Sequence, residues 1–172
     1  KSIVAEPLLH ARWLETLSYL ENSGAKKLIN YQGDGKVSSS LLQHTFEETG
    51  HAFLFKDKIR LIYSNDKAEV DLLAPLYTKR YLNVVDLFIA RCLKRDVSIH
   101  KDIVREANYY LCSYVVELRA CSLYKSYDAE LKSKSMPFRL KSIISEEASH
   151  LSQMKSWIKL NKLENIVLEC VR

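Results

Sequence analysis

Residues Asp102–Leu131 read DIVREANYYLCSYVVELRACSLYKSYDAEL, thirty positions without a glycine or a proline. Such an unbroken run between polar connections predicts one long helix in a helical core. Glu117 is the only glutamate between Glu106 and Glu130, and its neighbours one turn away are mostly tyrosine, cysteine and serine. A carboxylate on this inward-looking row needs a compensating partner. The stretch therefore predicts both a helical fold and a buried acidic group.

The rest of the chain carries further helical patterns. Pro7 suits a first turn, Ser38–Ser40 offer N-caps, and Ala74–Pro75 predicts a break or a kink. Only 4 Gly and 3 Pro occur in 172 residues and strand-like alternation is absent, so we predict an all-α fold in a single domain over residues 1–172. The other expected helices are Pro7–Ile29, Ser40–Ile62, Lys67–Lys94, Pro137–Leu160 and Leu163–Val171.

The net charge of +5 comes from basic residues in short groups, such as Lys26–Lys27 and Lys79–Arg80, with acidic residues nearby. This pattern predicts a solvated surface and no nucleic-acid partner.

No stretch approaches the ~20 apolar residues that span a bilayer, and no signal peptide is evident, so we expect a cytoplasmic protein without a membrane partner. The cysteines lie in apolar helical runs without Cys-x-x-Cys spacing, which predicts buried thiols in a reducing compartment; they are Cys92, Cys112, Cys121 and Cys170.

Two Glu-x-x-His pairs carry the chemistry, Glu48 with His51 and Glu147 with His150. Residues three apart on a helix are neighbours on one face, so the carboxylate and the imidazole of each pair can bind the same metal ion. Each pair falls on the apolar face of its predicted helix, where an uncompensated charge is unfavourable. A dimetal site in a four-helix bundle takes Glu-x-x-His from each of two helices and one Glu from each of the others. Glu117 supplies one of these glutamates.

The first helix offers Glu21 or Glu15 as the remaining ligand. If the turn after this helix is centred near Asp34, antiparallel packing brings Glu21 level with Glu48, whereas Glu15 lies about 9 Å away along the helix. We therefore assign Glu21 and keep Glu15 as the alternative. His44, one turn before Glu48, is interpreted as a core histidine, and its participation in the site is left open.

The complete set resembles that of the ferritin-like di-iron carboxylate superfamily, which includes rubrerythrins, bacterioferritins and related oxidases; its members here are Glu21, Glu48, His51, Glu117, Glu147 and His150. The resemblance covers about Pro7 to Leu160 and implies a four-helix bundle. The spacing of 30 residues from Glu117 to Glu147 is typical of that group, as is the spacing of 33 residues from Glu15 to Glu48. The connection from His51 to Glu117 is longer than in the minimal fold. This departure implies an extra helical segment, roughly Lys67–Lys94, in the crossover between helices two and three.

The resemblance implies two metal ions, with Fe expected and Mn or Zn as alternatives. It implies an oxidoreductase, either an oxidase or an oxygenase, or a protein of peroxide or iron handling. Because no C-terminal Cys-x-x-Cys module is present, electrons would come from a separate donor protein. The alternative function is a non-enzymatic helical bundle with a degenerate metal site, serving as a protein-interaction module.

Apolar residues on more than one side of Lys67–Lys94 also predict a homodimer whose interface includes part of this segment.

Overall fold

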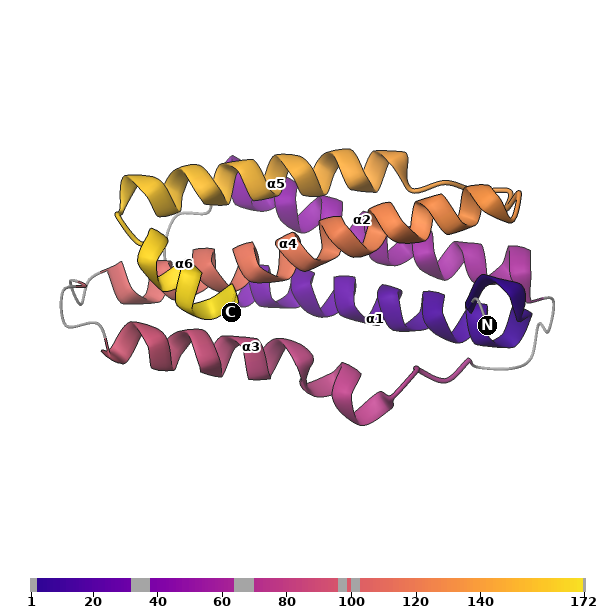
Figure 1. Ribbon diagram of the computed structural model, residues 1–172, viewed down its shortest axis with the longest axis horizontal. Coiled ribbons are helices and arrows are strands. Elements are labelled where there is room, and N and C mark those ends of the chain that lie inside the picture. The colour runs from indigo at the N-terminus through magenta and orange to yellow at the C-terminus, as the bar shows by residue number, and fades with distance from the viewer. Residues whose placement is uncertain (1–2, 32–37, 64–69, 96–98, 100–102, 172) are drawn as a thin grey trace. The chain divides into compact units, whose positions relative to one another are not determined.

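The computed structural model describes residues 3–31, 38–63, 70–95, 99 and 103–171, with only the backbone for 169–171. This part of the chain is all-α, as predicted, and contains no strand (Figure 1). Within it, no helix is long and apolar enough to cross a membrane. A short 3-10 turn, η1 (Ile3–Ala5), precedes six α-helices: α1 (Pro7–Tyr31), α2 (Ser39–Ile62), α3 (Pro75–Arg95), α4 (Val104–Ser133), α5 (Lys141–Leu160) and α6 (Glu164–Val171).

The helices form two compact units. The first unit comprises residues 1–81 and 129–139, and the second comprises residues 82–128 and 140–172. The long helix α4 contributes residues to both units, and so does α3. A single domain over residues 1–172 stays a prediction.

In the first unit, α1 and α2 pack antiparallel along most of their length (Figure 1). The side chain of Ser38 caps α2 by accepting a hydrogen bond from the Leu41 amide, as the sequence predicted. Across the pair, the Ser18 hydroxyl donates to the Ala52 carbonyl at 2.8 Å. Both helices contribute fully buried apolar side chains to this unit, among them Leu14, Leu17 and Phe55.

Helix α3 begins at Pro75, so the break predicted at Ala74–Pro75 is confirmed, whereas the helix predicted from Lys67 starts too early. Positions 67–69 lie outside the described residues. The helix starts later than predicted because the preceding segment bonds to α1 instead of to itself. Arg12 donates to the carbonyl oxygens of Asp71 and Leu72, and the Thr16 hydroxyl accepts from the Leu73 amide at 2.8 Å. Ala74 then has φ 43°, which breaks any helix before Pro75.

Helix α5 begins at Lys141, so the prediction that Pro137 opens this helix is also wrong. The intervening segment is held by tertiary contacts. In the first unit the Phe138 ring stacks on His10, with ring centroids 6.2 Å apart. In the second unit the Leu140 amide donates to the Asp128 carboxylate at 2.8 Å. These contacts favour a non-helical segment over a further helical turn.

Burial of His10 makes the folded protein sensitive to acid. Desolvation lowers the pKa of this imidazole from 6.5 to about 4, so the unfolded chain takes up the proton first as the pH falls. Stability present above pH 6.5 is then lost as the pH falls toward 4. Urea unfolding of the metal-free protein at pH 7 and at pH 4.5 measures this loss. Between these two pH values, the free energy of unfolding should fall by about 2 kcal/mol more in the parent than in His10→Leu. Equal falls would contradict this role of His10.

The second unit has its own apolar core. Residues from α3, α4, α5, α6 and the connection between α5 and α6 form it, and each is at most 4% exposed: Ile89, Cys92, Leu93, Ala107, Leu111, Cys112, Ile158, Leu163 and Ile166. Beside this core, the rings of Tyr110 and Trp157 stack with centroids 4.1 Å apart. The thiols of Cys92, Cys112 and Cys121 are buried, as predicted, whereas the side chain of Cys170 lies outside the described residues.

Candidate metal centre

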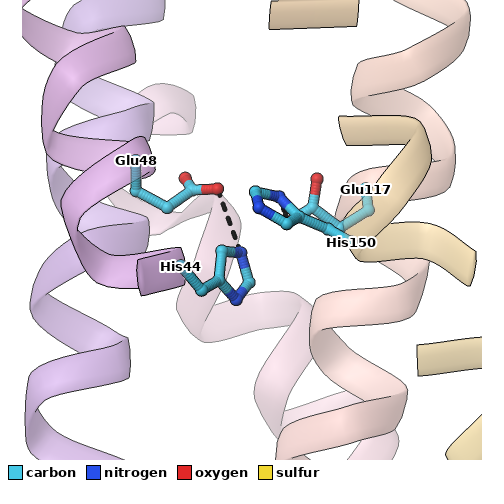
Figure 2. A group of neighbouring side chains, drawn as sticks. All are labelled: His44, Glu48, Glu117 and His150. Atoms are coloured by element: carbon cyan, nitrogen blue, oxygen red, sulfur yellow. Dashed lines mark hydrogen bonds and ion pairs between the residues drawn. The ribbon is translucent and has the colours of Figure 1, made fainter. Parts of the chain in front are cut away.

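The first unit contains a buried cluster of two carboxylates and two imidazoles, formed by Glu21 of α1 and His44, Glu48 and His51 of α2. One ligand atom each of Glu21, Glu48 and His51 lies within 4.8 Å of the others. His51 Nδ1 is 3.8 Å from Glu21 Oε2. His44 Nε2 is 3.2 Å from Glu48 Oε1, and Figure 2 shows this contact as a dashed line. His44, Glu48 and His51 follow one another at intervals of one turn on α2, so helical periodicity alone places them on one face.

The second unit contains a matching cluster formed by Glu117 of α4 and by Glu147 and His150 of α5. His150 Nδ1 is 3.9 Å from Glu117 Oε1 and 3.6 Å from Glu147 Oε2. Glu117 and His150 are drawn in Figure 2. Glu147 is only 1% exposed. One turn after Glu117, Cys121 has a raised pKa, because of burial and because of the Glu147 charge, which outweigh the lowering effect of Lys125.

The two clusters share one arrangement. In each, the histidine of a Glu-x-x-His pair presents Nδ1 to the single glutamate of the neighbouring helix, at 3.8 Å in the first cluster and 3.9 Å in the second. These separations exceed a hydrogen bond but fit two ligands of one ion. Two atoms that are each about 2.1 Å from a metal lie 3.6–3.9 Å apart when they subtend roughly 120–135° at it. Each cluster could therefore hold a metal ion.

The donor set defines the kind of ion that each cluster suits. Each cluster contributes two carboxylates, hence a formal charge of −2, which balances one divalent cation. Carboxylate oxygens combined with imidazole nitrogens suit Fe or Mn better than Cu(I). Zn also accepts this combination. Among the described residues, neither cluster includes a cysteine, so the ligand atoms available are carboxylate oxygens and imidazole nitrogens and not thiolate sulfurs.

All six residues assigned from the sequence are buried, and each lies in one of the two clusters; they are Glu21, Glu48, His51, Glu117, Glu147 and His150. Glu15, the alternative to Glu21, lies away from the first cluster, where it bonds to the half-exposed Lys56. The register of α1 against α2 differs from the expected one by three residues, since Glu21 lies beside His51 and Gly24 beside Glu48. Because three residues are nearly one helical turn, the same face of α1 still contacts the same face of α2.

The sequence reasoning missed Gly24. A Cβ atom built there would lie 3.1 Å from Glu48 Oε2, so an alanine at this position would displace the carboxylate by a few tenths of an ångström. The one signal in the sequence is a glycine inside a long predicted helix, where glycine is unfavourable by about 1 kcal/mol relative to alanine. Such a residue usually has a packing or functional reason.

No protein-family profile matches the chain, and comparison with curated proteins and with solved structures finds no match either. The two buried glutamate–histidine clusters could hold metal ions. This assignment of the kind of site therefore depends on the geometry of the residues.

Proposed function

We propose that this chain is a dimetal carboxylate protein of the ferritin-like type. In this proposal α1, α2, α4 and α5 are the four helices of the bundle, and α3 is the extra helix in the crossover. The observation that carries the proposal is the repeated arrangement of the two clusters, in which a Glu-x-x-His pair faces a single glutamate from the adjacent helix at nearly the same distance. That arrangement is the ligand pattern of dimetal bundles.

We further propose how the ligands divide between two ions. One ion would bind Glu21, Glu48, His51 and Glu147, and the other would bind Glu48, Glu117 and His150, with His44 close to Glu48. Glu48 would then be common to both ions. The four carboxylates carry a total formal charge of −4, which two divalent cations neutralise. Burial of these acids supports the proposal, because two buried carboxylates in one cluster would repel each other without a cation.

The proposed activity is that of an oxidoreductase acting on O₂ or peroxide, or of an iron-handling protein. A bound pair of iron ions supplies reversible electron transfer to oxygen species. The residues of the chain hold the ions through carboxylates and imidazoles, and the buried position of Glu147 and His51 excludes bulk water from the ligands. We propose that electrons for repeated turnover come from a separate donor protein.

The experiment that tests this function starts from metal-free protein loaded anaerobically with Fe(II). On exposure to O₂, the loaded protein should oxidise Fe(II) faster than an equal concentration of Fe(II) in buffer, as followed by absorbance in the near ultraviolet. Glu48→Ala should abolish the acceleration, whereas Glu47→Ala, which changes a neighbouring residue bonded to Gln43, should retain it. A rate equal to that of the buffer would favour the alternative, a helical interaction module with a degenerate site.

The second face of α3 supports the proposed homodimer. Ile89, Cys92 and Leu93 point into the core of the second unit, while other apolar side chains of α3 are 44–78% exposed; these are Leu76, Tyr77, Val84, Leu87 and Phe88. We propose that the exposed face contacts a second copy of the chain, since a two-fold dimer is the commonest way to bury such a surface.

Leu87→Lys should convert this dimer to a monomer, because it introduces a charge into an apolar contact. Sedimentation velocity at micromolar concentration should give about twice 19.9 kDa for the parent and 19.9 kDa for the variant. Lys155→Ala, which changes an exposed position on α5 and not on α3, serves as the control that stays dimeric. A parent that sediments as a 19.9 kDa monomer would contradict the proposed dimer.

A further inference from the structure

Glu48 is held from two sides within the first unit. His44 Nε2 lies 3.2 Å from one carboxylate oxygen, Oε1, and both residues are buried. Because a carboxylate only accepts hydrogen bonds, this contact requires the proton on Nε2 of His44. The other oxygen, Oε2, lies over Gly24 of the facing helix, 3.1 Å from where a Cβ atom would be.

Neither the helical backbone conformation nor a backbone contact requires a glycine at position 24. It lies inside α1, with seven helical residues after it, where alanine would stabilise the helix. Nor is the glycine required by a crowded backbone contact, since the nearest atoms to an added Cβ belong to the Glu48 carboxyl group. The space at Gly24 therefore serves the side chain of Glu48. By contrast, Gly50 of α2 has no atom within 4 Å of an added Cβ and faces solvent.

We infer that Gly24 and His44 are positioning residues that fix the carboxylate of Glu48 for metal binding. The inference rests on the proposed dimetal function, and it assigns a purpose to two residues outside the six-residue ligand set. His44 holds Oε1 in place, and the missing side chain at Gly24 lets Oε2 extend toward the facing helix. An alanine at position 24 would force Oε2 to retreat by a few tenths of an ångström. Changes that misplace a ligand through its neighbours typically weaken metal binding by about 10- to 100-fold.

Gly24→Ala and Gly50→Ala form a matched pair that separates this role from helix stability. Each replaces a helical glycine, so each should raise the Tm of the metal-free protein by about 2–4 °C. Only Gly24→Ala should weaken Mn(II) binding, by about tenfold or more in a competitive titration with a chelator. If Gly24→Ala binds Mn(II) as tightly as Gly50→Ala does, the inference is wrong. If the parent itself binds no Mn(II), Fe(II) or Zn(II), it is the proposed dimetal function that fails.

Two further variants test the contact with Glu48 directly. Glu48→Asp withdraws the carboxylate by one methylene, so adding Gly24→Ala in that background should weaken Mn(II) binding less than twofold further. An undiminished tenfold loss would show that Gly24→Ala acts elsewhere. His44→Gln keeps a donor for Oε1 and should bind Mn(II) more tightly than His44→Leu, which has none. Equal weakening by both would contradict the hydrogen-bonding role of His44.

Discussion

Glu147→Ala should reduce the metal content of the reconstituted protein from about two ions per chain to one or fewer. Glu147 is 1% exposed, and its Oε2 lies 3.6 Å from His150 Nδ1, so it contributes a fixed carboxylate to the centre of its cluster. Its removal takes away both a ligand and one of the four negative charges that balance the cations. The metal-free variant should still fold, because the apolar core of the second unit does not include this residue.

Glu146→Ala is the control for this experiment. Glu146 precedes Glu147 on α5 but belongs to neither cluster and is more exposed. Elemental analysis after dialysis should give the parental metal content for Glu146→Ala. A parental content for Glu147→Ala would remove this residue from the proposed site, and a loss in both variants would indicate that metal binding depends on the charge of α5 as a whole.

Removal of the metal should lower the Tm by about 10–20 °C. A ligand that binds only the folded state stabilises it by about 2.7 kcal/mol at a free concentration of 100 Kd, and two such sites double the effect. For a chain of this size, each kcal/mol shifts the Tm by about 2–4 °C. Thermal unfolding followed by circular dichroism, with excess Mn(II) and with EDTA, measures the difference. A Tm that is the same under both conditions would mean that the buried glutamates do not hold cations.

The helices and the buried faces of α1, α2, α4 and α5 were predictable because they depend on local periodicity. Glu48 and His51 are neighbours in any helix, and so are Glu147 and His150, so their placement required no knowledge of the tertiary structure. The choice of Glu21 over Glu15 followed from antiparallel packing, which tolerates an error of three residues in register because that error is close to one helical turn.

The features that the sequence did not predict depend on contacts between distant segments. The break at Ala74–Pro75 was predictable from the proline, but the bonding of residues 71–73 to Arg12 and Thr16 of α1 was not, because it joins segments distant in the sequence. Helix α5 begins after Pro137 for a similar reason, since Phe138 stacks on His10. The space at Gly24 could not be inferred, because it is defined by a carboxylate on another helix.

The stoichiometry of bound metal tests the central claim most directly. Metal-free protein should be incubated with excess Fe(II) under anaerobic conditions, freed of unbound ions, and analysed by inductively coupled plasma mass spectrometry against protein concentration from amino-acid analysis. The same measurement with Mn(II) and Zn(II) identifies the preferred ion. A dimetal carboxylate centre predicts about two ions per chain of 172 residues. A content near zero for all three metals would contradict the account.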